Sequence, residues 1–232
     1  MPETLILIPG LGSDAAVWER TIAALGDRAD CTVGDTLSDD SLGGMARRIL
    51  AAAPERFALA GVSMGGMVAL EILRIAPERV TRLAIIDSNP RPDTPEGAAL
   101  RRQQIAGARA PGDPRARAEA SLAYLIHRDA PADVREAIVA MSLRVGMEAY
   151  ARQSEAVLHR EDQRPILSAI TVPTLVVMGA DDAMIPRDRA EEVVAAVPGA
   201  ELAVIPDCGH LPPIEAPEAV AELLSAWLER AE

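Results

Sequence analysis

The chain has 232 residues, of which 49% are hydrophobic and 25% charged, and its formal net charge is −12. This length and composition indicate one globular domain with at most a small insertion, and an acidic chain without a dense Lys/Arg run is not expected to bind nucleic acid. Its apolar stretches are far shorter than the roughly 18 residues that a membrane span needs, so no membrane crossing is expected.

Short apolar runs alternate with helical patterns over the first 90 residues. Buried strands are predicted at residues 5–8, 31–33, 57–62 and 83–86. The first helix is predicted to begin at the capping pair Ser13 and Asp14 and to stop at Gly26; further helices are predicted over 42–53 and 64–76. Such alternation is typical of a parallel sheet with right-handed crossovers and helices on both faces.

The same alternation returns near the end of the chain, with strands predicted over 174–178 and 202–205 and helices over 188–197 and 217–230. We therefore expect a mostly parallel sheet of about six strands.

Between the two blocks, helical patterns rich in Ala, Arg and Glu are broken at Pro111, Pro114 and Pro131. We expect a helical lid over 91–164, inserted into an α/β core formed by 1–90 and 165–232. The alternative is that these are ordinary crossover helices of the sheet, but the segment is too long for one crossover.

A G-x-S-x-G pattern, Gly61-Val62-Ser63-Met64-Gly65, lies where the third predicted strand ends and the third helix begins. A serine on so sharp a turn is held clear of the sheet, and the flanking glycines avoid collisions with the neighbouring strand and helix. The placement predicts that Ser63 is a nucleophile. The alternative is a glycine-rich turn that lets a helix pack closely.

A serine hydroxyl is a poor nucleophile at neutral pH unless a base takes its proton, so the hypothesis requires a histidine. The chain has three, His127, His159 and His210. The first two lie on helical patterns of the predicted lid, where a solvated or packing role is expected. His210 follows the last predicted strand, and sites in open α/β sheets form at the carboxyl ends of strands.

The histidine needs an acceptor that fixes its tautomer and stabilises the imidazolium. Asp181 and Asp182 follow the strand at 174–178, and spacing alone allows either of them. The chain order Ser, Asp, His differs from the orders in chymotrypsin and subtilisin. Asp87, after the strand at 83–86, is a further candidate, with a turn-forming or helix-capping role as its alternative.

Two backbone N–H groups usually stabilise the tetrahedral oxyanion, and one of them belongs to the residue after the nucleophile, here Met64. The second is expected in the loop at residues 9–13, and we predict Leu11. A plain strand-to-helix turn capped by Ser13 or Asp14 is an alternative that can hold at the same time.

With these pieces in place, the chain resembles the α/β-hydrolase superfamily, specifically its small esterase-like members with a helical lid. Three blocks carry the resemblance: PGLGSD; GVSMGGMVALEILRIAPERV; and the pair VPTLVVMGADDAMIP and IPDCGHLPPIEAPEAV. In this family the acid stands three residues after the glycine and four before the proline, which selects Asp182 over Asp181. The resemblance implies a triad of Ser63, Asp182 and His210. One departure is Pro9, where the family usually has histidine.

The resemblance implies hydrolysis of a carboxylic ester, or a related thioester or lactone, of a small and mainly apolar substrate through an acyl-enzyme, without a metal or organic cofactor. Alternatives on the same triad are a perhydrolase, a cofactor-free dioxygenase or a hydrolase of carbon–carbon bonds. A non-catalytic binding protein of this fold is an alternative from another class.

The expected partner is a small-molecule substrate; Arg91, Arg101, Arg102 or Arg109 could bind a substrate carboxylate, although solvated positions are the default. Two cysteines, Cys31 and Cys208, in no metal-binding or disulfide pattern, and an N-terminus without a secretion signal favour a cytoplasmic protein. The sequence does not predict an oligomeric state.

Overall fold

The computed structural model describes residues 3–230. Residues 1–2 and 231–232 lie outside the described residues. Parts of two predictions fall on them: the outer ends of the predicted α/β core, and the first residues of the N-terminus in which no secretion signal is expected. None of the described helices is both long enough and apolar enough to cross a membrane.

Six strands form one parallel sheet in the order β2-β1-β3-β4-β5-β6. They are β1 (Thr4–Ile8), β2 (Asp30–Val33), β3 (Phe57–Val62), β4 (Val80–Ile86), β5 (Thr174–Gly179) and β6 (Glu201–Ile205). The central strands β3, β4 and β5 are buried along their whole length. These strands are mainly apolar, because helices cover both faces of a parallel sheet. The six-stranded parallel sheet predicted from the sequence is confirmed.

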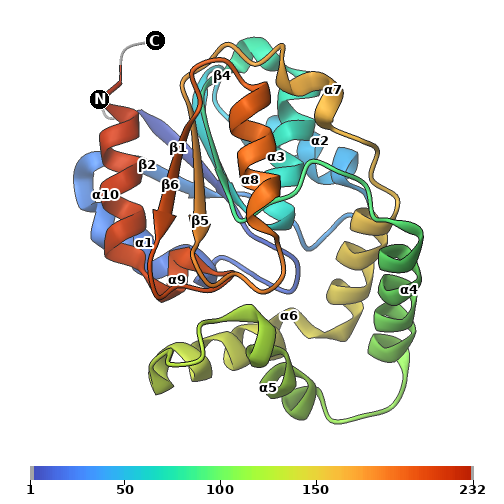
Figure 1. Cartoon of the computed structure of the whole chain (residues 1–232). Coiled ribbons are helices and arrows are strands. Elements are labelled where there is room, and N and C mark those ends of the chain that lie inside the picture. Colours follow the sequence, from blue (N-terminus) through green and yellow to red (C-terminus); the bar gives the residue numbers. More distant parts are fainter. Residues whose placement is uncertain (1–2, 231–232) are drawn as a thin grey trace.

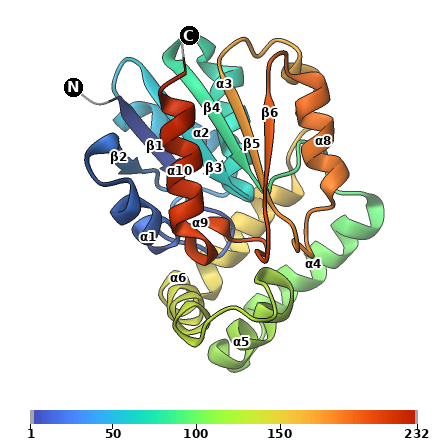
Figure 2. The same cartoon turned by 60° about the vertical axis from the view of Figure 1, so that its left-hand side comes forward.

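Helices α1 (Ala16–Leu25) and α10 (Pro217–Leu228) cover one face of the sheet. Helices α2 (Leu42–Ala52), α3 (Met64–Ile75) and α8 (Arg187–Ala196) cover the other face (Figures 1 and 2). Alternate residues of one strand serve the two layers: Leu5 and Leu7 pack with α1 and α10, whereas Ile6 and Ile8 pack with α2 and α3.

The first helix begins later than predicted. Ser13 and Asp14 were expected to cap it, but α1 starts at Ala16 with Ala15 as its N-cap residue. Ser13 is instead 2% exposed, and its amide closes a turn by donating to the Gly10 carbonyl. Asp14 accepts a hydrogen bond from the Ala16 amide at 2.9 Å, so it supports the first turn without being the cap.

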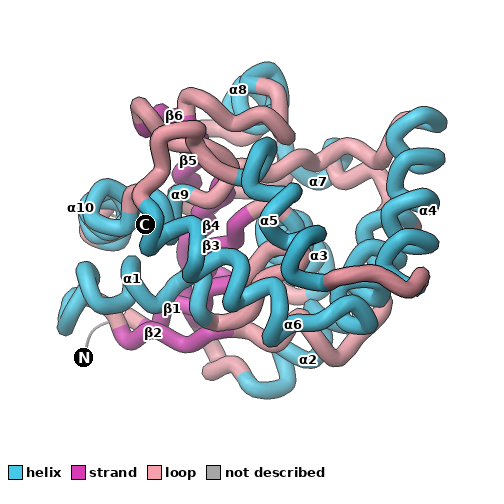
Figure 3. The backbone as a smooth tube through the Cα atoms, turned by 90° about the horizontal axis from the view of Figure 1, so that it is seen from below, coloured by secondary structure: helices cyan, strands magenta, loops and turns pink. Residues whose placement is uncertain are grey.

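The inserted segment between β4 and β5 contains α4 (Pro95–Arg109), α5 (Pro114–Leu125) and α6 (Ala132–Leu158), followed by the short α7 (Arg164–Leu167). Proline occupies a first-turn position of α4 and of α5, where its missing N–H costs nothing. Helices α5 and α6 lie across the carboxyl ends of the strands, as Figure 3 shows from below. This is where ligands bind in open α/β sheets.

Candidate active site

Ser63 lies on the turn between β3 and α3. Its backbone has φ 55° and ψ −120°, a conformation that residues with a side chain rarely adopt. The Ser63 amide donates to the Ile86 carbonyl at 2.8 Å, and the Ser63 carbonyl accepts the hydroxyl proton of Ser88 at 2.7 Å. The strained turn is thus held from the end of β4, and the Ser63 hydroxyl points away from the sheet into the cavity described below.

Two glycines permit this turn. A Cβ on Gly61 would overlap the backbone of Gly65, and a Cβ on Gly65 would overlap the carbonyl oxygen of Ile8 at the end of β1. Any larger residue at either position would therefore push β3, α3 or β1 aside. The G-x-S-x-G letters reflect close backbone packing around Ser63 rather than loop flexibility.

His210 follows β6 in an irregular loop and is 2% exposed. Its Nε2 lies 2.8 Å from Ser63 Oγ, and its Nδ1 lies 2.8 Å from Asp182 Oδ2. With the ring proton on Nδ1, His210 donates to Asp182, and Nε2 is free to accept the serine proton. The structure thus brings together the serine, histidine and aspartate that were predicted from positions far apart in the sequence.

Asp182 is held by its own loop. Its Oδ1 accepts hydrogen bonds from the amides of Met184 at 2.7 Å and Ile185 at 3.0 Å, which leaves Oδ2 for His210. Burial opposes ionisation of this carboxyl, but hydrogen bonding to His210, the charge of His210 and hydrogen bonding to Asp87 lower the pKa of Asp182 below its usual value. A carboxylate that stays ionised can stabilise an imidazolium beside it.

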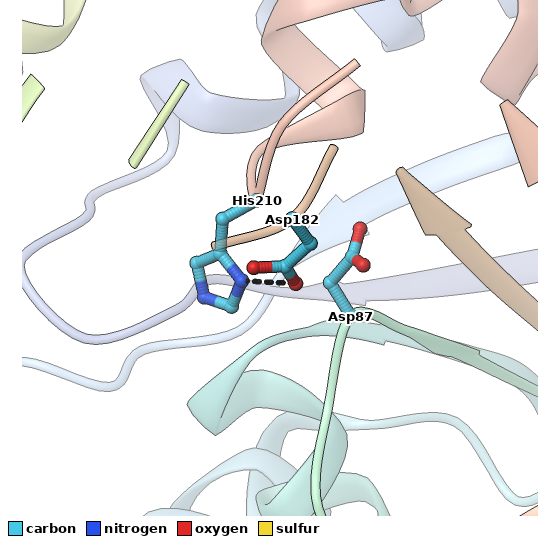
Figure 4. A group of neighbouring side chains, drawn as sticks. All are labelled: Asp87, Asp182 and His210. Carbon is cyan, nitrogen blue, oxygen red and sulfur yellow. Dashed lines mark hydrogen bonds and ion pairs between the residues drawn. The ribbon is translucent and has the colours of Figure 1, made fainter. Parts of the chain in front are cut away.

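The two alternative acids lie elsewhere. The Asp181 side chain is 51% exposed and lies 3.9 Å from His127 Nε2. Asp87 is buried on the far side of Asp182 from His210, and its two carboxylate oxygens accept from the Gly179 amide, each at 3.1 Å (Figure 4). Neither makes a hydrogen bond with His210 within the described residues.

Asp87 forms a pair of carboxyl groups with Asp182. Burial, and then the charge of Asp182, raise the pKa of Asp87 well above its usual value. The pKa values of the two carboxyl groups are thus driven in opposite directions, down for Asp182 and up for Asp87.

The Asp87→Asn variant should gain stability over the wild type as pH rises above about 4. The unfolded wild-type chain loses the Asp87 proton at a lower pH than the folded chain does, so this group lowers wild-type stability as pH rises, and asparagine removes that dependence. Urea unfolding of both proteins at pH 4 to 8 measures the difference. A difference in unfolding free energy that does not change with pH would contradict a raised pKa of Asp87.

The residues predicted as oxyanion donors lie on both sides of Ser63. Met64 is the first residue of α3, and a Cβ on Gly10, next to Leu11, would lie 3.2 Å from the Ser63 Cβ. Within residues 3–230, neither the Leu11 nor the Met64 amide donates a hydrogen bond. Two free N–H groups beside the serine could donate hydrogen bonds to a developing negative oxygen.

Sequence analysis missed Gln153, which lies on α6. Its Oε1 accepts from the Gly12 amide at 2.8 Å, and its Nε2 donates to the Thr36 carbonyl at 3.2 Å. The ring of Tyr150 lies close by, because a Cβ on Gly12 would be 3.5 Å from it. The inserted segment therefore supports the loop that carries Leu11, and no short motif in the sequence signals this contact.

A cavity of about 370 Å³ lies between the carboxyl end of the sheet and the inserted helices, with Ser63 and His210 in its wall. The wall is mainly apolar: Leu11, Met64, Met67, Ala108, Ala118, Leu125, Ile138, Met141, Val145, Met147, Val157, Met184, Ile185 and Leu211 line it. Tyr124 and Tyr150 add aromatic surface. Apart from His210, the lining side chains that can carry a positive charge are Arg101 and Arg117, and no described aspartate or glutamate lines the cavity. Such a wall suits an apolar ligand without positive charge.

Most arginines proposed as carboxylate ligands are paired with acids. Arg91 pairs with Glu192 at 2.8 Å, and Arg109 pairs with Glu155 at 3.3 Å. Arg102 is exposed and does not line the cavity. Arg101 alone among the four lines the cavity, although Asp93 holds its Nε at 2.6 Å.

Two groups of side chains could approach a metal ion. Asp87, Asp182 and His210 offer ligand atoms within 4.8 Å of one another, and His127, Asp181 and Asp207 form a second such group. In the first group, a 2.8 Å hydrogen bond already joins His210 to Asp182 and leaves no room for an ion between them. In the second, Nδ1 of His127 already accepts from the Asp129 amide at 3.3 Å, and Asp181 and Asp207 are exposed. Neither arrangement favours a metal.

Comparison with protein families gives a match to the model described as "Alpha/beta hydrolase family" over residues 5–223. Among curated proteins, the pimeloyl-(acyl-carrier protein) methyl ester esterase of Pectobacterium carotovorum subsp. carotovorum is 29% identical, covering 97% of this chain and 94% of that protein. The protein of the same name from Aromatoleum aromaticum is 29% identical, with 95% and 96% covered.

Solved structures show the same likeness. A thermophilic esterase from Thermogutta terrifontis superposes with a TM-score of 0.86 at 30% identity, covering 98% of this chain and 90% of that one. The enol-lactonase from Burkholderia xenovorans LB400 shares the fold, with a TM-score of 0.85, 24% identity, and 99% and 92% of the two chains covered.

Proposed function

The chain belongs to the alpha/beta hydrolase family as an esterase-like member, and from that membership we propose that it hydrolyses a carboxylic ester through an acyl-enzyme on Ser63. The observation that carries the proposal is the pair of 2.8 Å contacts that His210 makes, one with Ser63 and one with Asp182. A serine in contact with a buried, oriented base is an activated nucleophile.

In the first half-reaction, Ser63 Oγ attacks the ester carbonyl while its proton passes to His210 Nε2. The Asp182 carboxylate, already bound to Nδ1, stabilises the imidazolium that forms. The carbonyl oxygen becomes an oxyanion, and the free amides of Leu11 and Met64 donate to it. The intermediate then collapses: the carbon–oxygen bond to the alcohol breaks, His210 returns the proton to the departing alkoxide, and the acyl group stays on Ser63.

In the second half-reaction, water replaces the alcohol. His210 Nε2 takes a proton from the water as the water oxygen attacks the acyl carbon, and a second oxyanion forms in the same place. Collapse breaks the bond to Ser63, whose oxygen recovers the proton from His210, and the carboxylic acid leaves. The cycle needs no metal and no organic cofactor.

We propose a small ester with a mainly apolar body as the substrate, in keeping with the cavity wall and with the methyl ester esterases among the relatives. We also propose a cytoplasmic location, because both cysteines, Cys31 and Cys208, are unpaired.

The charge of the cavity wall predicts discrimination against cationic esters. Choline butyrate should have a kcat/KM at least roughly tenfold below that of 3,3-dimethylbutyl butyrate, its uncharged isostere. Arg117 and, to a smaller extent, Arg101, which is paired with Asp93, would repel the ammonium, and no described carboxylate lines the wall. Choline is the better leaving group, so chemical reactivity works against this result. Steady-state kinetics on both esters measures it, and Arg101→Gln should narrow the gap. Equal rates would contradict the electrostatic reading of the wall.

Intact-mass analysis after exposure to a fluorophosphonate tests the proposed function directly. One adduct per chain on the wild type, with hydrolysis of short p-nitrophenyl and methyl esters, is expected from an activated serine. Absence of both adduct and hydrolysis in a folded sample would favour a binding protein of this fold. An adduct without ester hydrolysis would favour one of the other reactions that use the same residues.

A further inference from the structure

The loop that carries His210 has no regular structure from the end of β6 to the start of α9 (Pro212–Glu215). Such a loop must be fixed by other contacts if His210 is to stay within hydrogen-bonding distance of both Ser63 and Asp182. The fixing group is the carboxylate of Glu215, which the reaction scheme above does not use.

Glu215 binds the amides on both sides of His210. Its Oε2 accepts from the Gly209 amide at 3.1 Å, and its Oε1 accepts from the Leu211 amide at 3.0 Å. The His210 amide between them donates to the Leu125 carbonyl at 3.0 Å. Three consecutive amides are therefore satisfied, and the backbone at His210 is held from two directions.

Glu215 also binds the inserted segment. Its Oε2 accepts from the His127 amide at 2.7 Å, the shortest of its three hydrogen bonds. The approach is close, because a Cβ on Gly209 would lie 2.6 Å from the His127 nitrogen. One carboxylate thus joins the loop of His210 to the chain at the end of α5.

We propose that Glu215 is a positioning residue: it holds His210 between Ser63 and Asp182 and fixes the inserted segment at residues 125–127 against the same loop. We call the three hydrogen bonds that Glu215 accepts the Glu215 clamp. The kinetic consequence of the proposal rests on the proposed function, but the clamp itself does not. A carboxylate offers two oxygens that both accept, and both are needed here for three N–H groups. Glutamine keeps the size but turns one of these oxygens into a donor that faces an N–H.

The test compares Glu215→Gln with Glu218→Gln, a matched change of an exposed glutamate on α10. Hydrogen–deuterium exchange measures how well the Glu215 clamp protects these amides, and it does not depend on enzyme activity. Glu215→Gln should exchange faster at residues 125–127 and 209–211 together, while Glu218→Gln matches the wild type. Unchanged exchange at both segments would overturn the proposal.

Whether Glu215 positions His210 is measured by kinetics on an ester that the wild type hydrolyses. Glu215→Gln should lower kcat about 10- to 100-fold with KM within roughly threefold, because displacement of a reacting group by about 1 Å costs rate rather than binding. Faster exchange with unchanged kcat would overturn the positioning role. If Glu215→Gln does not fold, Glu215→Asp, which keeps two acceptors on a shorter arm, serves in the same two measurements with the same outcomes.

Failure of this inference differs from failure of the proposed function. If the wild type forms no fluorophosphonate adduct, the acyl-enzyme proposal is wrong, and the kinetic effect of Glu215 has no basis. The exchange comparison still tests whether Glu215 holds the two segments together. An active wild type whose Glu215→Gln variant behaves like Glu218→Gln overturns only the role of Glu215.

Discussion

Ser63→Ala should lower kcat for ester hydrolysis by about a millionfold and abolish the fluorophosphonate adduct. The variant keeps the turn, because alanine has the same Cβ as serine, but it has no oxygen to attack the substrate. His210→Ala should cost a similar factor, and the double variant should cost little more, since the two side chains act as one unit. Single-turnover kinetics and intact-mass analysis measure both effects.

Ser168→Ala is the control for this experiment, because Ser168 is exposed and does not line the cavity. It should keep wild-type kinetics and the adduct. Turnover by Ser63→Ala near the wild-type rate would contradict the acyl-enzyme and favour chemistry in which His210 and Asp182 deprotonate the substrate directly, as in a cofactor-free dioxygenase.

Asp182→Asn should lower kcat by about 10⁴-fold with little change in KM. The reason lies in the use of the two carboxylate oxygens. Oδ1 accepts from the Met184 and Ile185 amides, so asparagine will place its carbonyl oxygen there and its NH2 group toward His210 Nδ1. Nδ1 must then accept, the ring proton moves to Nε2, and His210 faces Ser63 with a donor instead of an acceptor.

Asp87→Asn is the matched control, since it changes a buried aspartate next to Asp182 that makes no hydrogen bond with His210 within the described residues. Asparagine keeps the size of aspartate and a carbonyl oxygen that can accept from the Gly179 amide, so kcat should stay within about tenfold of the wild type. If Asp87→Asn cost as much as Asp182→Asn, the two carboxyl groups would be acting as one unit, and the assignment of Asp182 alone as the acid would be wrong.

Much of the sheet could be predicted from the sequence because its central strands are mainly apolar and buried on both faces, so that hydrophobic runs in the sequence mark them. The largest difference is β4, which begins at Val80, since Thr81 and Arg82 interrupt the apolar run yet are both buried. The start of α1 was predicted too early because Ser and Asp are both favoured N-cap residues. In the structure, Ser13 instead closes a turn with Gly10, and Asp14 accepts from the Ala16 amide.

The placement of Ser63 and His210 at strand ends could also be predicted from the sequence, because the carboxyl ends of parallel strands meet at one edge of the sheet. Spacing alone could not decide between Asp181 and Asp182, since both follow β5. The family resemblance selected Asp182, and the structure separates the two by their exposure and by the hydrogen bond of Asp182 to His210. The raised pKa of Asp87 and the role of Gln153 could not be predicted for a similar reason. Each depends on a partner at least 92 residues away, which local patterns do not encode.

Gly146 divides α6 into two halves with different attachments. It has φ 73° and ψ 164° inside the helix. Beyond it, Ala151 packs with Ile105 and Ala108 of α4, and Gln153 binds Gly12. The second half of α6 and α4 therefore belong, in practice, to the catalytic scaffold.

Before Gly146, the chain from α5 to the first half of α6 shapes the cavity wall, and its hydrogen bonds to the His210 loop come from backbone atoms at Leu125 and His127. Backbone atoms are supplied by any sequence. The interchangeable module for engineering substrate range is thus shorter than the insertion: it runs from about residue 111 to 145. A chimera built with those junctions would exchange the part of the wall that this stretch supplies, which includes Ala118, Leu125, Ile138, Met141 and Val145. One that replaced the whole insertion would also remove the support that Gln153 gives to the loop that carries Leu11.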